Sequence, residues 1–474
     1  MNPDSVQSLV LRAPHGPTVA HRVLQVPPGR GIAALHVLRR QVLTSFGPRP
    51  PDAPCQSLGF SFEGLQALGV PEGYLRLFRR LAPAFRDGAV LRSTQLGDSG
   101  ASAAPNWMPE FQSSWPHVVV TWFGSAYQVR QWHDAFVKEW QDAVGPAGPG
   151  SAPGAWPPRL YGRRLGAPPL QTGEWVHYGF RDGLSEVCID QDEPRPQAPD
   201  LRDHKPGALL LGHVDDAGTN PFVLSQAPDK VRRFFHDSSF GILRPMAQDV
   251  AAFEQQVQAW AAQLAPLYPV PVSTDFVKSK LGGRWPDGSV PLPGQLAPSD
   301  RFVVHPKGEP SDFPGDAMGQ GCPFGSHVRR MRAAPDGRGR VFERPLQRRS
   351  VPFGSADWGG QSRDGQPRGL LGHFFCASIE DQFEHLLGQW AAGPPLGASR
   401  DDQAPDPLTG PHQDASAGLR VPLQDRPVQH LSGFRAWTTT LGTLYAWYPG
   451  SDGLQALMDN DFIPDEDDGE RPWR

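Results

Sequence analysis

The chain has 474 residues, of which 38% are hydrophobic and 20% are charged. This composition indicates a globular protein with a sizeable core, and the length allows two to four domains or one large duplicated unit. The formal net charge is −5, which argues against a nucleic-acid-binding protein dominated by phosphate contacts. With 52 glycines and 53 prolines, many loops are expected.

The four cysteines are widely spaced and form no CxxC pair, which excludes a recognisable zinc ribbon and a disulfide framework. No apolar run approaches the ~20 residues of a membrane span, so we expect no membrane partner. The first residues, MNPDSVQSLVLRAPHG, lack the basic and apolar regions of a secretory signal and a twin-arginine motif. These features predict a cytoplasmic protein.

Strand-like and helix-like patterns alternate over the first 140 residues. The stretches SVQSLVL (5–11), HRVLQVP (21–27) and HVVVTWF (117–123) are typical of strands because they are apolar and rich in β-branched residues. Helical spacing of apolar residues predicts helices over 32–42, 65–78 and 128–140. The Gly/Pro-rich stretch 144–158 then indicates a domain boundary.

The second half shows the same alternation. SFGIL (239–243) and HFFCAS (373–378) predict strands, each followed by apolar residues at helical spacing, over 250–260 and 379–390. We therefore predict two α+β units, in residues 1–158 and 159–458, followed by an acidic tail at 459–474. The polar or Pro-rich stretches 192–206 and 393–418 are expected to be solvated insertions, as is the tail.

Three short stretches carry residues suited to chemistry. They are YGFRDGLSE (178–186), GCPFGSHVRR (321–330) and LQRRSVPFG (346–354). Each is weak alone, because an Asp-Gly pair is usually a turn and paired arginines are usually a solvated face. Their order along the chain, GxxDG, then CPxxxHxRR, then RxxxPFG, resembles the dye-decolorizing peroxidase family of haem proteins.

The resemblance extends over roughly residues 5–450. LGDSGASAAPNW (96–107) is similar to a turn in the family's N-terminal domain, and KLGGRWPDGSVPL (280–292) resembles a stretch of its larger, C/D-type members. GLLGHFFCASIEDQFEHLLGQW (369–390) is similar to another family stretch. The fold implied is α+β, with two ferredoxin-like domains of the dimeric α+β barrel type, each an antiparallel sheet with helices.

The resemblance implies that His327 is the iron ligand of haem b, with the open side of the haem facing Asp182 and Arg348. The second ring nitrogen of His327 needs an acceptor, for which Glu343 and Glu380 are candidates that sequence cannot separate. Asp182 is suited to move a proton between the two oxygens of peroxide. Arg348 is suited to stabilise the charge that develops as the O–O bond breaks.

The resemblance also implies haem contacts by Leu371 and Phe374. Arg348 is preferred to Arg349 because it lies four residues before Pro352, as the distal arginine of the family does. Two departures from the family pattern leave the shape of this pocket open. Ser350 stands two residues after the distal arginine, where the family often has Asn or Gly, and Gly372 replaces the phenylalanine of the family's GLLF stretch, which is GLLG (369–372) here. The neighbouring His373 is expected to be structural, with a second ligand or base as the alternative.

The sequence thus predicts a haem peroxidase that uses hydrogen peroxide to oxidise dyes and other aromatic or phenolic donors. The alternative is a haem-binding or haem-handling protein with incidental peroxidase activity, and a metal-free regulatory protein is a third reading. Asp182 and Arg348 argue against mere binding, which needs neither. The 14 Trp and 7 Tyr residues could supply surface relays of electrons, but none is singled out. A homo-oligomer remains an open alternative.

Overall fold

The computed structural model describes residues 1–12, 14, 16–50, 53–112, 116–146, 158–183, 186–189, 203–298, 316–335, 341–362, 364–395, 404–411 and 418–464. Most of the predicted insertion at 192–206 and of the predicted acidic tail lies outside these residues. Within the described part of the chain, no helix is long and apolar enough to cross a membrane.

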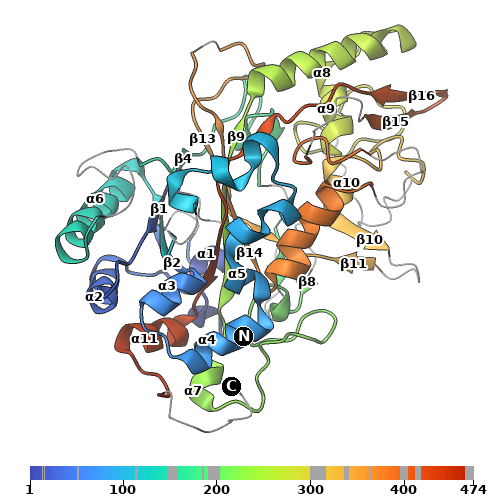
Figure 1. The fold of residues 1–474 in the computed structure, drawn as a ribbon. Helices are drawn as coiled ribbons and strands as arrows, with labels where there is room; N and C mark the ends of the chain where they lie inside the picture. Colours follow the sequence, from blue (N-terminus) through green and yellow to red (C-terminus); the bar gives the residue numbers. More distant parts are fainter. Residues whose placement is uncertain are drawn as a thin grey trace.

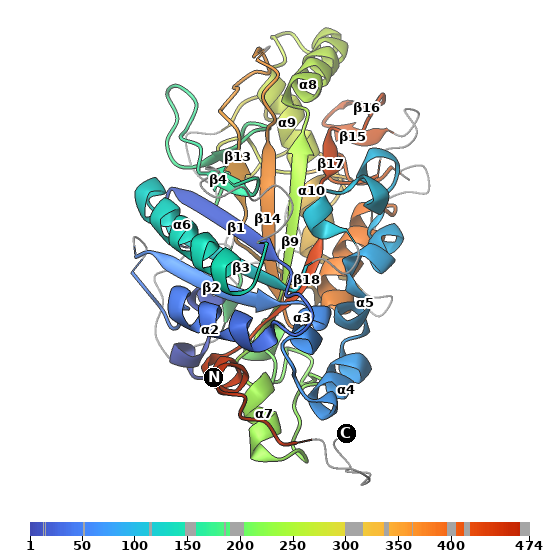
Figure 2. The same cartoon turned by 60° about the vertical axis from the view of Figure 1, so that its left-hand side comes forward.

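The N-terminal half forms a βαββαβ unit. Its strands are β1 (Thr18–Leu24), β2 (Cys55–Phe60), β3 (Val118–Gly124) and β4 (Tyr161–Arg163), and they lie in the spatial order β4-β1-β3-β2. This chain order and strand order are those of a ferredoxin-like unit. The helices α2 (Gly31–Gln41) and α6 (Ala126–Ala143) pack side by side on one face of the strands (Figure 2).

The C-terminal half repeats this arrangement with a divided second strand. Strands β9 (Ser239–Gln248), β14 (Gly369–Cys376) and β18 (Leu444–Tyr448) lie in the order β14-β9-β18, and β12 (Gln347–Arg348) and β13 (Val351–Phe353) both pair with β14. The crossover helices are α8 (Val250–Leu264) and the π-helical segments η8 (Ile379–Glu384) and η9 (Leu386–Ala391). The second half is therefore also ferredoxin-like.

The two units share one ten-stranded sheet, because β18 of the second unit pairs with β2 of the first. At the other ends, β4 comes close to β13 without pairing with it: a Cβ on Gly162 would lie 2.8 Å from the carbonyl oxygen of Pro352. Among the described strands the sheet is therefore curled but is not a closed barrel. Figure 2 shows β14, β9 and β18 running side by side through the centre of the molecule.

Most predicted elements are present in the structure. The helix over 65–78 is two helices, α3 (Phe62–Ala67) and α4 (Glu72–Leu81), since Pro71 begins a new helix. The predicted strand over 5–11 is wrong, because Ser8–Leu11 forms the short helix α1. The Gln7 side chain there bonds to both backbone groups of Leu58 in β2, at 2.9 and 3.1 Å. A short buried apolar run cannot separate helix from strand by its periodicity.

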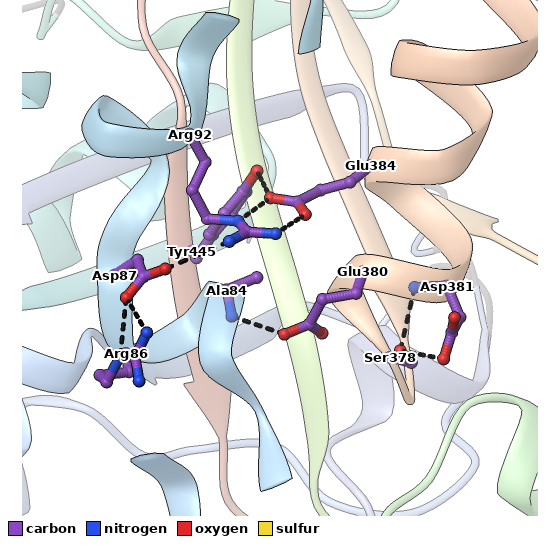
Figure 3. Close-up of polar contacts among 9 residues, drawn as sticks. All are labelled: Ala84, Arg86, Asp87, Arg92, Ser378, Glu380, Asp381, Glu384 and Tyr445. Atoms are coloured by element: carbon purple, nitrogen blue, oxygen red, sulfur yellow. Dashed lines mark hydrogen bonds and ion pairs between the residues drawn. The ribbon is translucent and has the colours of Figure 1, made fainter. Parts of the chain in front are cut away.

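An ion-pair network joins the units across the face of the C-terminal strands (Figure 3). Arg92, at the end of α5 (Pro83–Arg92), donates two hydrogen bonds of 2.6 Å to the carboxylate of Glu384 in η8. The hydroxyl of Tyr445 in β18 donates to the same carboxylate at 3.0 Å. Buried charges are tolerated when paired and hydrogen-bonded in this way, so the network fixes α5 against η8.

A second hydrophobic core lies among α8, α9 and the β15–β16 hairpin. Figure 1 shows this core at one end of the molecule, beyond the strand ends. The remaining elements are short, and their bounds are η1 Pro3–Ser5, η2 Ser93–Leu96, η3 Gly100–Ser102, η4 Ala104–Asn106, η5 Pro109–Phe111, β5 Trp175–Val176, β6 Phe180–Arg181, β7 Cys188–Ile189, β8 Asp203–His204, η6 Pro206–Ala208, α7 Asp229–Phe235, η7 Ala265–Leu267, α9 Thr274–Gly282, α10 His327–Arg332, β10 Ala333–Pro335, β11 Val341–Glu343, β15 Leu419–Leu423, β16 Arg426–Leu431, β17 Thr438–Thr440 and α11 Ser451–Asp459.

Candidate active site

His327 is the first residue of α10, and buried polar contacts hold the turn before it. The hydroxyl of Ser326 donates to the carbonyl oxygen of Lys280, at 2.5 Å. The buried Lys280 ammonium in turn donates to the carbonyl oxygens of Gln320 and Gly321, each at 2.8 Å. The helix α9 therefore fixes the start of α10, and with it the position of the imidazole.

The arginines that follow His327 have structural contacts. Arg330 is buried and donates to the carbonyl oxygens of Gly325 and Gly393, at 2.9 and 2.7 Å. Arg329 donates to the Cys322 carbonyl oxygen at 2.7 Å and pairs with Asp316 at 3.3 Å. The cationic run thus closes the loops around α10.

The carboxylate partner of His327 is Asp406. The imidazole Nδ1 lies 2.9 Å from Oδ2 of Asp406, whose side chain is fully buried. The other oxygen, Oδ1, accepts from the backbone nitrogens of Leu408 and Thr409, both at 2.9 Å. Burial alone would lower the pKa of His327, but Asp406 raises it above its usual value.

Neither predicted partner of His327 occupies this place. Glu380 accepts from the backbone nitrogen of Ala84 at 2.5 Å, on the side of η8 that faces α5 (Figure 3). Glu343 pairs with His204, at 3.5 Å. Glu343 lies close to His327 in the sequence and Glu380 lies in the stretch 369–390, whereas the acceptor comes from a loop beyond η9.

Asp406 corrects the prediction that 393–418 is a solvated insertion, because its side chain has 0% exposure and accepts backbone hydrogen bonds. One sequence signal could have identified it. The stretch DPLTG (406–410) has the Asp, Pro and Gly positions of a turn in which the carboxylate bonds to backbone nitrogens ahead of it. Such a turn holds a carboxylate rigidly.

Asp182 and Arg348 form an ion pair across the site. Both guanidinium Nη atoms contact the carboxylate, the longer contact being 3.4 Å from Nη2 to Oδ2. The backbone nitrogen of Gly183 donates to Asp182 Oδ1 at 2.8 Å. Burial raises the pKa of Asp182, but Arg348, this backbone bond and the nearby Arg164 outweigh burial and hold the pKa below its ordinary value.

Arg164 was not predicted as part of this site. It lies close enough to Asp182 for its charge to favour the carboxylate form, and it is tied to the side chain of Glu174 and the carbonyl oxygen of Pro14. The carbonyl oxygen of Glu174 accepts from the backbone nitrogen of Asp182 at 2.7 Å. This pair therefore supports the position of Asp182, and no motif of the sequence indicated it.

The register of the strands separates Arg348 from Arg349. Arg348 in β12 lies opposite Phe374 and Val351 in β13 lies opposite Leu371, so the two short strands pair with β14 in the same register. Side chains alternate along a strand, so Arg349 faces away from Arg348. Arg349 is buried, pairs with Glu186 at 2.9 Å and donates to the Leu9 carbonyl oxygen at 2.7 Å.

The same alternation of side chains places the two apolar residues expected to contact haem, Leu371 and Phe374, on opposite faces of β14. Phe374 shares the face of Arg348, because residues opposite each other in a ladder share a face. Leu371 lies on the other face, in the core beside Gly162, so the structure does not bring it to Arg348. His373 also lies on that other face, fully buried, with Nε2 2.9 Å from the Tyr448 hydroxyl. It is a structural histidine, as expected.

The residues present fit a haem. His327 is half-buried, with 33% of its side chain exposed, and no described residue is hydrogen-bonded to its Nε2. The charge of Arg348 reaches His327 and disfavours its protonated form, so the Asp182–Arg348 pair lies near the imidazole. An imidazole nitrogen without a partner, backed by a carboxylate and facing an open position, is the donor arrangement of an axial iron ligand.

Comparison with known proteins agrees with the fold and with the motifs. No protein-family model matches the chain. Over 268 residues the chain is 27% identical to the multifunctional dye peroxidase DyP2 of Amycolatopsis sp. (strain ATCC 39116 / 75iv2), a match that covers 53% of this chain and 52% of that protein. The chain thus spans about half the length of this relative. It is 24% identical over 403 residues to the dye-decolorizing peroxidase msp1 of Mycetinis scorodonius, covering 81% of this chain and 70% of that protein.

The fold defines the class of protein: this is the α+β fold of the dye-decolorizing peroxidases. A solved dye-decolorizing peroxidase in complex with 2,6-dimethoxyphenol superposes with a TM-score of 0.73 at 21% identity, over 97% of this chain and 99% of that one. The two curated relatives are named as a dye peroxidase and a dye-decolorizing peroxidase. The resemblance predicted from the motifs is therefore confirmed.

Proposed function

We propose that this chain is a haem-dependent peroxidase that uses hydrogen peroxide to oxidise dyes and other aromatic or phenolic donors. One observation carries the proposal: a carboxylate and a guanidinium are held together near an imidazole whose Nε2 has no described partner. A protein that merely binds haem needs neither group. Peroxide cleavage needs both, one to move a proton and one to stabilise charge.

In this proposal His327 holds the iron of haem b through Nε2. Asp406 accepts a hydrogen bond from Nδ1–H, which fixes the tautomer and makes the imidazole a stronger electron donor to iron. Haem, when bound, supplies an iron that coordinates peroxide and takes up its oxidising equivalents. Asp406 is held by backbone nitrogens, so the imidazole it orients is held as well.

On the opposite side of the haem we assign two roles. Asp182 takes the proton from one peroxide oxygen and returns it to the other, and its lowered pKa keeps it ionised for that task. Arg348 stays cationic and stabilises the charge on the departing oxygen. Phe374, on the face of Arg348, supplies an apolar wall that excludes water.

The comparisons support the class of donors. The relatives are named as dye peroxidases, and one structural neighbour holds 2,6-dimethoxyphenol, a substituted phenol. We also propose a boundary at 458 and a cytoplasmic location, with a homo-oligomer as an open alternative. The boundary predicted at 158 falls before β4, which pairs with β1 of the N-terminal unit. The location is supported by four cysteines that are all buried and free.

Stopped-flow mixing of the haem-loaded protein with stoichiometric peroxide tests the proposal. We expect a rapid change of the Soret band, loss of peroxide and oxidation of 2,6-dimethoxyphenol at a rate that depends on both Asp182 and Arg348. If the haem-loaded, unaltered protein shows no such reaction, the chain is a haem-binding protein instead. If Asp182→Asn and Arg348→Leu react as fast as an active unaltered protein, the roles assigned to these two residues are wrong.

A further inference from the structure

Two histidines and an aspartate converge at the start of the central strand β9. Nε2 of His213 lies 2.6 Å from Oδ1 of Asp237, and Nδ1 of His236 lies 3.2 Å from Oδ2. One ligand atom from each of the three side chains lies within 4.8 Å of the others. None of these residues belongs to the site formed by His327, Asp182 and Arg348.

The backbone holds the three side chains in place. His236 ends α7, and Asp237 follows it with a positive φ of 57°, a conformation that Asp and Asn tolerate better than most residues. Leu211 exchanges backbone hydrogen bonds with Asp237 and Ser238, at 3.2 and 2.8 Å, which brings the loop of His213 against this turn. The ring of His236 approaches Gly212 closely, where a Cβ would lie 2.9 Å from it.

The electrostatics suit a cation. Asp237 is 97% buried on its side chain, and its two carboxylate oxygens face the ring nitrogens of His213 and His236. A cleft of about 270 Å³ opens beside His236 and Asp237. Its other charged walls are Asp229, Asp452, Arg232 and Arg233. Counting Asp237, three aspartates face two arginines, a formal charge of −1 with neutral imidazoles.

We propose that His213 Nε2, His236 Nδ1 and the Asp237 carboxylate bind one divalent transition-metal ion of the zinc class. Imidazole nitrogens and a carboxylate oxygen are ligands that Zn²⁺ prefers, at about 2.0–2.2 Å. Two such atoms at a tetrahedral angle on one ion lie about 3.3–3.6 Å apart. The 2.6 Å contact between His213 and Asp237 therefore has to widen, and any spacing near the 4.8 Å limit has to shorten by about an ångström. The ion replaces the protons that now join the imidazoles to Asp237.

This site is open, unlike a closed four-ligand structural site. With three protein ligands, its remaining coordination position faces the cleft and takes water. The ligands come from the loop after η6, the end of α7 and the residue before the turn into β9. A bound ion therefore ties these three segments together, and it stabilises the folded chain without contact with the proposed haem site.

Titration of the untagged, haem-loaded protein with Zn²⁺ in a calorimeter tests this inference. We expect one equivalent bound per chain and a higher thermal unfolding midpoint with the ion present. His236→Gln, at a half-exposed ring, should fold normally and bind Zn²⁺ more than about 100-fold more weakly, since even outer partners of a metal ligand cost about 10–100-fold. Asp237→Asn, which keeps the backbone preference of this position, should behave likewise.

The matched control is His36→Gln, at an exposed histidine of α2, which should bind like the unaltered protein. Absence of binding by the unaltered protein overturns the proposal. The same stoichiometry and affinity in His236→Gln also overturns it, because the ion would then reside elsewhere. Peroxidase activity should be equal in His236→Gln and in the unaltered protein, which separates this site from the proposed haem site.

Discussion

Asp406 accepts a hydrogen bond from Nδ1 of His327 at 2.9 Å, although 79 residues separate the two in the chain. Its second oxygen is held by the turn DPLTG, so the imidazole is oriented by a carboxylate that cannot move. The Nε2 atom is thereby directed to the open position where we place iron.

Replacing Asp406 should weaken haem binding. In Asp406→Ala the imidazole loses its orienting acceptor, and outer-shell partners of metal ligands typically contribute about 10–100-fold in affinity or activity. The rate of haem transfer to an excess of a haem-scavenging protein measures the loss. Glu380→Gln is the matched control, because Glu380 contacts Ala84 rather than the histidine. Equal haem loss in both variants would contradict the assignment of Asp406.

Removing the imidazole should abolish the proximal ligand. His327→Gly is expected to lose haem or hold it with an altered Soret band, because no described residue is placed to substitute for Nε2. Added imidazole should restore the band, since the deleted ring leaves room of its own shape. A normal band and full activity in His327→Gly without imidazole would sink the assignment.

Substitution of Arg348 should lower the rate of reaction with peroxide, whereas substitution of Arg349 should lower the stability of the protein. Arg348→Leu should fold, bind haem and react with peroxide about 10²–10³ times more slowly, the usual cost of losing one charge-stabilising donor. Arg349→Leu should destabilise the protein by about 3 kcal/mol, the low end for breaking a buried ion pair, because Glu186 is 40% exposed. Urea unfolding and the rate per folded molecule separate these effects, and exchanged phenotypes would show that the register is misassigned.

The acid limit of activity should follow Asp182. Its pKa lies below the ordinary value of 3.8, so the carboxylate remains a base as the pH falls, and the base is lost only below that lowered pKa. Peroxide consumption should therefore persist in acid wherever the protein stays folded. In Arg348→Leu the raising effect of burial is less opposed, so the acid limb of the residual activity should move to higher pH. If the acid limb of the pH–rate profile stays in place in Arg348→Leu, or if Asp182→Asn has unaltered rates at every pH, Asp182 is not the base.

The contact between the two units should carry part of the stability. Arg92→Met leaves the carboxylate of Glu384, which is 7% exposed, without its cation, and such a loss costs about 3–5 kcal/mol. Arg92→Met with Glu384→Gln should recover much of this, because the amide oxygen still accepts from Tyr445. The urea midpoints of the two variants decide the point, and equal midpoints would mean that the buried charge does not cause the loss.

Local patterns predicted several of the main elements. The helices at 32–42 and 128–140 correspond to α2 and α6, because their apolar residues recur at helical spacing. The strands at 117–123 and 239–243 correspond to β3 and β9, and each is a short apolar run followed by a helical pattern. The strand predicted at 5–11 is wrong, because the conformation of this short run depends on the hydrogen bonds between the Gln7 side chain and β2. That information is not local.

The sequence by itself determined which chemistry we propose for the chain. The order of Asp182, His327 and Arg348 within their motifs gave the resemblance to the dye-decolorizing peroxidases, because residue types and short spacings can be read along the chain. The tertiary structure decided which groups act on one another. Pairing of β12 with β14 turned Arg348 toward Asp182 and Leu371 away from it, and the fold placed Asp406 behind His327. Such relations depend on strand register and on packing between distant segments, where a shift of one residue reverses the face of every side chain.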